Sequence, residues 1–264
     1  MKNIFKRIYN LLTYFNPKIE TEFKTIHVGT RYGGYDIYSN SLENPVIISC
    51  GLGEDASFDV DMINRYNAKV IAIDPTPRSI KYYNSLKMRF GKKGAGNYDE
   101  SGNLDISFYD LSLVNELNFL FENKAIWKVS DENLKLFYPI NKEHISLSIN
   151  KKKTNQNYFV AQTISIEDIY KKYNLEEVDI LKLDVEGAEL QIIESMLQKK
   201  IYPKQLLIEF DIRRTKSIKN KIILSKLHNK ILIYYSLIHI NTKGDFTYIR
   251  KDISQNCPQC SFLE

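Results

Sequence analysis

The chain contains little cysteine, proline, glycine or tryptophan. Its 264 residues include three cysteines, seven prolines, 11 glycines and one tryptophan. Three cysteines are too few for a disulfide framework, and so low a count is typical of a reducing compartment. Cys257 and Cys260 form a C-x-x-C pair near the end of the chain, but no second pair completes a four-ligand zinc site. With 43% hydrophobic residues, the composition excludes a disordered or fibrous protein.

Long apolar runs are also absent, and no segment approaches the roughly 20 residues that a transmembrane helix needs. Residues 1–17 contain a short apolar stretch without a small-residue cleavage site, which argues against a signal peptide. Their spacing predicts an amphipathic helix whose apolar face carries Ile4, Phe5, Ile8, Leu12 and Phe15. We expect this face to pack on the chain's own domain or on a partner subunit, with weak membrane-surface contact as the alternative. The expected location is the cytoplasm.

The net charge is +5, and the basic surplus is clustered. Lysines and arginines concentrate in the N-terminal segment, in Lys151–Lys153 and in residues 213–230. We interpret them as solvated helix faces and loops, with a patch for an acidic glycan or a membrane as the alternative. Because no RNA-binding signature and no Cys/His finger are present, a nucleic-acid partner is not expected.

Apolar segments alternate with amphipathic ones from residue 45 onward. Continuous apolar runs predict buried strands at 45–49, 69–74, 178–184 and 204–211. Helical spacing predicts helices at 56–66, 78–90, 112–121, 165–174, 186–200 and 213–229. Further strands are expected at 105–109, 124–129 and 133–139, with a closing antiparallel pair at 231–241 and 245–251. This alternation predicts an α/β fold with a mostly parallel sheet and helices on both faces.

Residues 1–44 do not follow this alternation. Short β-like pieces at 24–28 and 35–39, broken by Gly33 and Gly34, predict a small hairpin. Together with the N-terminal helix they form an extension, residues 1–44, that precedes a main domain at 45–264. Polar loops are expected within that domain at 91–103 and 141–158.

The loop after the first main-domain strand predicts a cofactor site. Gly51 and Gly53 begin a G-x-G-x-x-A pattern, and Asp74 follows at the distance expected of a ribose-binding acid. Glu54 and Asp55, the latter a natural N-cap for the next helix, place two carboxylates where a dinucleotide pyrophosphate would sit. Like charges repel, whereas S-adenosylmethionine presents a sulfonium and an ammonium to these acids. An NAD-type oxidoreductase and a simple tight turn are the alternatives.

Four segments together resemble the FkbM family of S-adenosylmethionine-dependent methyltransferases: GLGEDASFD at 51–59, AIDPTP at 72–77, HISLSI at 144–149 and ILKLDVEGAE at 180–189. The resemblance implies a class I methyltransferase fold, a Rossmann-like sheet of seven strands whose last strand is antiparallel. It implies S-adenosylmethionine as cofactor and O-methylation, often of sugars or other small hydroxylated molecules. Ser49 and Asp55 depart from the general acid-x-G-x-G-x-G pattern, because they replace its first acid and its third glycine.

A second group of charged residues lies where the 178–184 strand ends. Lys182, Asp184 and Glu186 alternate, so their side chains point one way, toward the ligand edge of a parallel sheet. Asp184, with Lys182 beside it, is the candidate base that orients or deprotonates an acceptor hydroxyl. Glu186 and Glu189 also have a structural interpretation, because acids in a first helical turn complement the helix dipole.

A divalent cation is another way to activate the hydroxyl. Asp184, Glu186 and Asp211, together with Glu209, are candidate ligands, and carboxylates suit Mg²⁺ or Mn²⁺ better than zinc. His144 is the alternative base, since imidazole titrates near neutral pH, although a loop histidine is more often simply exposed.

Trp127 closes the predicted strand at 124–129. The resemblance makes it a candidate wall for the adenine ring, with core packing as the alternative. We therefore expect an FkbM-like enzyme that methylates a hydroxyl of a glycan, a glycolipid precursor or a related small molecule. The rivals are an NAD-type oxidoreductase and a non-catalytic Rossmann-like module that binds a partner.

Overall fold

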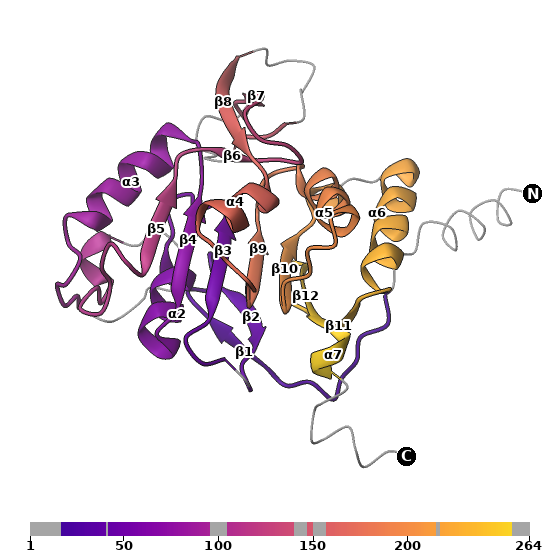
Figure 1. Cartoon of the computed structure of the whole chain (residues 1–264), viewed down its shortest axis with the longest axis horizontal. Helices are drawn as coiled ribbons and strands as arrows, with labels where there is room; N and C mark the ends of the chain where they lie inside the picture. The colour runs from indigo at the N-terminus through magenta and orange to yellow at the C-terminus, as the bar shows by residue number, and fades with distance from the viewer. Residues whose placement is uncertain are drawn as a thin grey trace, which may run out of the picture.

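Four nearly continuous apolar strands form the centre of the sheet, as parallel strands covered on both faces must. They are β3 (Val46–Cys50), β4 (Lys69–Ile73), β9 (Ile180–Leu183) and β10 (Gln205–Glu209). This computed structural model describes residues 17–40, 42–95, 105–139, 147–149, 157–214 and 217–254. Its main sheet has seven strands in the order β11-β12-β10-β9-β3-β4-β5, flanked by helices (Figure 1).

Strand directions confirm the expected fold class. β5 (Phe119–Glu122) runs parallel to β4, and β3, β9 and β10 continue the parallel set. β12 (Asp245–Arg250) is antiparallel both to β10 and to the edge strand β11 (Tyr235–Ile240). The chain therefore has a mixed α/β sheet whose last described strand is reversed.

Two apolar layers join the helices to the two faces of the sheet. On one face the core includes residues of α4 (Ile166–Lys172), α5 (Glu189–Gln198) and α6 (Ile218–Ile231). On the other face it includes α2 (Ser57–Tyr66) and α3 (Pro77–Lys87), and α7 (Lys251–Ser254) follows β12. The N-cap of α2 lies one residue later than predicted: Ala56 occupies it, and the Asp55 side chain accepts a hydrogen bond from Ser57 N at 2.8 Å.

The predicted hairpin is present and packs on the main sheet. It consists of β1 (Thr25–Val28) and β2 (Tyr35–Tyr38), paired antiparallel. The Gln205 side chain bonds both the backbone N and the backbone O of Tyr38, at 2.9 and 2.8 Å. Thr247 Oγ1 donates to Asp36 O at 2.6 Å. Hairpin side chains thus share a core with α2, α3 and the sheet.

The segment from 105 to 164 differs most from the sequence prediction. A 3₁₀ turn at Ile106–Phe108 replaces the expected strand, and turns followed by β5 replace the helix expected at 112–121. β6 (Ala125–Ile126) is much shorter than predicted, β7 (Asn133–Phe137) is as expected, and β8 (Tyr158–Ile164) was not predicted. These three strands form a second sheet, ordered β6-β8-β7, beyond one end of the main sheet (Figure 1).

Candidate active site

A cavity of about 320 Å³ opens at the carboxyl ends of β3, β4 and β9. The chain moves outward from β3 to β4 and β5 on one side, and to β9 and β10 on the other. Ligands of open α/β sheets bind at such a point, where the strand order reverses. The volume lies within the range of small-molecule sites.

The two glycines of the first loop form the floor of this cavity. Gly51 has φ +86°, and a Cβ there would lie 1.9 Å from the Asp184 carbonyl oxygen. Gly53 has φ +58° and faces open space, because a Cβ there would meet no atom within 4 Å beyond its chain neighbours. The first glycine therefore allows β3 and β9 to approach each other, and the second leaves room for a ligand.

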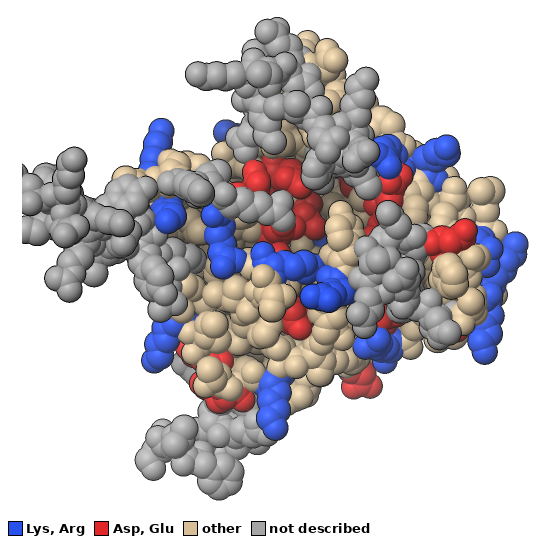
Figure 2. Space-filling model, turned by 180° about the vertical axis from the view of Figure 1, so that it is seen from behind, with Lys and Arg blue, Asp and Glu red and all other residues tan. Residues whose placement is uncertain are grey.

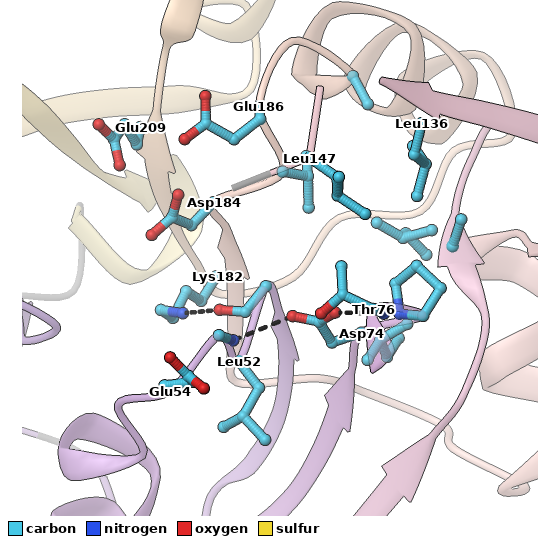
Figure 3. Close-up of a pocket in the computed structure, with 18 of the residues that line it drawn as sticks. Leu52, Glu54, Asp74, Thr76, Leu136, Leu147, Lys182, Asp184, Glu186 and Glu209 are labelled. Atoms are coloured by element: carbon cyan, nitrogen blue, oxygen red, sulfur yellow. Dashed lines mark hydrogen bonds between the residues drawn. The ribbon is translucent and has the colours of Figure 1, made fainter. Parts of the chain in front are cut away.

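Asp74 joins the end of β4 to the glycine loop. Its Oδ2 accepts from Gly53 N at 3.0 Å and its Oδ1 from Thr76 N at 2.8 Å (Figure 3). Burial raises the pKa of Asp74, while these hydrogen bonds oppose the rise. The predicted ribose-binding acid thus lines the cavity in a fixed orientation.

The adjacent acids Glu54 and Asp55 have different surroundings. Glu54 forms a two-bond ion pair with Arg78 at the cavity rim, at 2.6 and 3.2 Å. The Asp55 carboxylate accepts from Thr30 Oγ1 at 2.7 Å and from the Tyr109 hydroxyl at 3.2 Å. Arg78 compensates the charge of Glu54, and Asp55 is only 9% exposed. The loop therefore repels an anion less than its sequence suggests.

A second set of carboxylates occupies the other end of the cavity. Asp184 follows β9, Glu186 lies in the loop before α5, and Glu209 ends β10. Figure 3 shows these three side chains on the same side of the cavity. The loop between β9 and α5 is tightly bent, with Glu186 at φ +49° and Gly187 at φ +102°. Ser148 Oγ donates a hydrogen bond to the carbonyl oxygen of Glu186 at 2.8 Å.

Comparison of the sequence with known families identifies the family to which the chain belongs. The sequence profile described as "Methyltransferase FkbM domain" matches residues 27–231, which is more than three quarters of the chain. This chain belongs to the FkbM methyltransferase family. The family uses S-adenosylmethionine, and the matched region includes the glycine loop, Asp74 and both ends of the cavity.

Comparisons with individual proteins give only distant likenesses. No curated protein sequence matches. A chain in the crystal structure of a fibrillarin/Nop5p complex aligns with a TM-score of 0.42 and 7% identity, over 78% of this chain and 72% of that one. The Methanococcus jannaschii fibrillarin pre-rRNA processing protein aligns with a TM-score of 0.39 and 12% identity, over 89% and 86%.

Lys182 of this FkbM methyltransferase supports the glycine loop. Its side chain is 4% exposed, and Nζ donates to Gly51 O at 2.9 Å (Figure 3). The ammonium also lies 5.3 Å from the ring centroid of Tyr35, on the hairpin strand β2. Lys182 therefore lies within the predicted site. Its hydrogen bond there is to the backbone of the glycine loop.

Glu189 is buried next to the acidic end of the cavity. It is 3% exposed, and its Oε1 accepts from Gly187 N at 2.9 Å. Burial raises the pKa of Glu189 to about 8, and the charges of Asp211 and Asp184 add to the rise. The carboxyl consequently keeps its proton near neutral pH, so it adds no full negative charge beside Asp184.

The candidate metal ligands do not form a cluster. Asp211 begins a 3₁₀ turn after β10 and does not line the cavity. Within the described parts of the chain, no three His, Cys, Asp or Glu side chains are grouped as a metal ion requires. The described residues therefore form no cluster for the predicted Mg²⁺ or Mn²⁺ ion, and no step below depends on one.

Trp127 does not reach the cavity. Its backbone N bonds Ile164 O at 2.9 Å, and its side chain packs against the core beneath α4 and α5. The apolar wall comes instead from the second sheet and its neighbours, which sequence analysis missed: Ala125, Ile126, Leu134, Leu136, Leu147 and Ile149. The sequence signals for that wall were the alternating apolar residues of β7 and the HISLSI segment, which contains Leu147 and Ile149.

Other predicted features lie outside the described residues. His144, Lys151–Lys153, the helix within residues 1–16, and the Cys257 and Cys260 pair all belong to this group. Throughout the described segments, no helix combines the length and apolar character needed to cross a membrane.

Proposed function

We propose that this FkbM methyltransferase transfers a methyl group from S-adenosylmethionine to a hydroxyl of a sugar, a glycan or a related small molecule. The cofactor follows from the family, and the hydroxyl acceptor is the proposal. The order of chemical groups along the cavity fits the cofactor, and the carboxylates at one end of the cavity are the main support for the acceptor.

That order matches the parts of the cofactor. Asp184, Glu186 and Glu209 lie at one end, Asp74 lies beside the glycine floor, and Leu136 belongs to the apolar wall at the other end (Figure 3). S-adenosylmethionine has a cationic sulfonium, a ribose with two hydroxyls and an apolar adenine ring, in the same sequence. Opposite charges attract, carboxylates accept hydroxyl hydrogen bonds, and aromatic rings pack on apolar side chains.

The acidic end also fits the acceptor. When bound, S-adenosylmethionine supplies an electrophilic methyl group. Asp184 would accept the proton of the acceptor hydroxyl as its oxygen bonds to the methyl carbon and the carbon–sulfur bond breaks. Glu186 and Glu209 would accept hydrogen bonds from neighbouring hydroxyls and so orient the ring. His144 is the alternative base.

Charge favours a neutral or polyhydroxylated acceptor over a strongly anionic one. Basic and acidic side chains lie next to each other on the face shown in Figure 2, so the net charge of +5 does not make a uniformly basic surface there. Carboxylates outnumber the two lysines, Lys182 and Lys243, among the residues that line the cavity.

We keep the cytoplasm as the proposed location and a weak membrane-surface contact of the N-terminal segment as a proposal.

The cofactor site is tested by calorimetric titration with S-adenosylhomocysteine and, separately, NAD⁺. We expect S-adenosylhomocysteine to bind and Asp74→Asn to weaken it at least about tenfold, because a charged acceptor for two hydroxyls is lost. Asp131→Asn is the matched control, since Asp131 is 80% exposed and does not line the cavity. Binding of NAD⁺ instead would reject the assignment.

The acceptor is tested with methyl-labelled S-adenosylmethionine and fractionated cell extracts. Label should enter the saccharide or glycolipid fraction as an alkali-stable methyl ether, and Asp184→Asn should abolish the transfer. Label confined to protein, nucleic acid or amines would contradict the hydroxyl acceptor while leaving the methyltransferase assignment intact.

A further inference from the structure

Tyr32 is a large aromatic residue at the active-site cavity that stays exposed to solvent. It lies in the turn between β1 and β2, and it is 62% exposed. Among the described residues that line the cavity, it is the one aromatic side chain. An exposed aromatic side chain in the wall of a cavity is typical of a surface that binds a ligand. None of the four segments that carry the family resemblance contains it.

The turn that carries Tyr32 is fixed from two sides. Lys243 Nζ, in the turn between β11 and β12, donates to Tyr32 O at 2.7 Å. Gly33 N donates to Thr30 Oγ1 at 2.9 Å, and this hydroxyl donates to Asp55 Oδ2 at 2.7 Å. A Cβ on Gly33 would lie 2.6 Å from Asp55 Oδ2, so the turn rests directly on the glycine loop. A well-anchored loop therefore carries Tyr32 at the cavity.

The same contacts place Tyr32 at the acidic end of the cavity. Lys243 Nζ, which holds its backbone, lies 3.6 Å from Asp245 Oδ2. Asp245 is the register partner of Glu209, one of the carboxylates at that end. Leu136 and the apolar wall lie at the opposite end (Figure 3). Tyr32 consequently belongs to the part of the cavity proposed for the acceptor, away from the part proposed for the adenine ring.

An aromatic ring and carboxylates together match the chemistry of a cyclic sugar. The hydroxyls of such a ring project around its rim, whereas its C–H bonds form two apolar faces. An aromatic side chain buries one of these faces, and carboxylates accept hydrogen bonds from the hydroxyls. An open-chain polyol offers the same hydroxyls without a flat apolar face, so it gains less from the aromatic ring.

We propose that Tyr32 is a specificity-determining residue, on which the C–H face of a cyclic acceptor stacks while the carboxylates bind its hydroxyls. The inference rests on the proposed function for the hydroxyl acceptor, and it narrows that acceptor to sugars in their ring form. It gives the N-terminal hairpin a part in the choice of substrate. Tyr32 takes no part in cofactor binding.

The test compares Tyr32→Ala and Tyr32→Phe with Tyr234→Ala. Tyr234 is a matched control, because it is 40% exposed, lies between α6 and β11 and does not line the cavity. The first readout is calorimetric titration with S-adenosylhomocysteine. All three variants should bind it within about twofold of the original affinity. A loss of about tenfold confined to Tyr32→Ala would assign the ring to the cofactor and overturn the proposal.

The second readout is the initial rate of transfer from methyl-labelled S-adenosylmethionine, measured over serial dilutions of the saccharide fraction of a cell extract. Tyr32→Ala should raise the half-saturating amount of this fraction about tenfold, because apolar contact is lost, and leave the maximal rate within about twofold. Tyr32→Phe, which keeps the ring, and Tyr234→Ala should both match the original protein. An unchanged half-saturating amount in Tyr32→Ala would overturn the proposal, as would an equal loss in Tyr32→Phe.

The labelled product separates the two levels of the argument. Mass spectrometry should place the methyl ether on a cyclic sugar residue. Label on an open-chain polyol would overturn the stacking proposal and leave the hydroxyl acceptor intact. Label confined to protein, nucleic acid or amines would reject the proposed acceptor and the stacking proposal together.

Discussion

The Asp55 carboxylate faces the protein interior, where Thr30, Ser57 and Tyr109 donate hydrogen bonds to it. Glu54, one residue earlier, faces the rim and pairs with Arg78. Asp55 lines the cavity, as the sequence pattern predicts, and its carboxylate also connects the hairpin turn to the start of α2. A buried acceptor with three donors is expensive to remove, because each donor is then left without a partner.

Asp55→Asn is therefore expected to lower the free energy of unfolding by about 1–3 kcal/mol, since the amide places donors against donors. Glu54→Gln should change it by no more than about 0.5 kcal/mol, because its ion pair is partly exposed. Urea unfolding of both variants measures the difference. Equal effects would mean that Asp55 is not held as described.

Glu189 predicts a pH dependence of stability. Its pKa is about 8 in the folded protein and 4.5 for the free side chain, so between these values the folded state binds more protons. Stability due to Glu189 is therefore present below about pH 4.5 and is lost as the pH rises through 8, on the order of 5 kcal/mol in all. Glu189→Gln, which stays neutral and can still accept from Gly187 N, should flatten the curve. Parallel urea-unfolding profiles for the two proteins from about pH 5 to 8.5 would contradict this.

At the scale of elements, the second sheet completes the cavity. Leu134 and Leu136 of β7 line it, while Val160 of β8 is 45% exposed on the other side of the same hairpin. This alternation follows from the two-residue period of a strand. The small sheet therefore presents an apolar face to the ligand and a mixed face to solvent.

We expect Leu136→Ala to weaken S-adenosylhomocysteine binding about tenfold, because apolar contact with the adenine ring is lost. Val160→Ala, on the opposite side of the hairpin, should bind the ligand as the original protein does. Calorimetry gives the affinities, and adenosine alone should show the same loss. Unchanged adenosine binding would place the wall against the acceptor instead.

At the scale of the whole molecule, the hairpin and the main sheet share one core. Val28, Tyr35 and Ile37 belong to the same apolar cluster as residues of β3 and β4. Gln205 and Thr247 add hydrogen bonds from β10 and β12. The matched family region also begins inside the predicted extension, at residue 27.

Hairpin and sheet are therefore expected to unfold together. In native-state hydrogen exchange, amides of β2 should show the same opening free energy and urea dependence as amides of β10. Exchange of β2 at low urea, well before β10, would show that the hairpin is a separate unit.

The central strands, the N-terminal hairpin and the closing pair β11–β12 were predictable, but the segment from 105 to 164 was not. β3, β4, β9 and β10 are buried on both faces, so their apolar runs carry an unambiguous signal. Residues 112–121 satisfy a helical pattern equally well, yet the end of this stretch pairs with β4 as part of β5, with Val70 opposite Phe119. A short apolar run cannot distinguish the two structures, and the available partner strand decides.

The sequence alone determined the fold class, the glycine floor and the position of Asp74 and Asp184 at strand ends, because strand order and spacing dictate them. Only the tertiary structure decided how the carboxylates are partnered: it bonded Asp55 to Thr30, paired Glu54 with Arg78 and kept Asp211 out of the cavity lining. It also brought Leu136 to the site. Side-chain direction and long-range proximity depend on how separate elements pack, which no local pattern of residues contains.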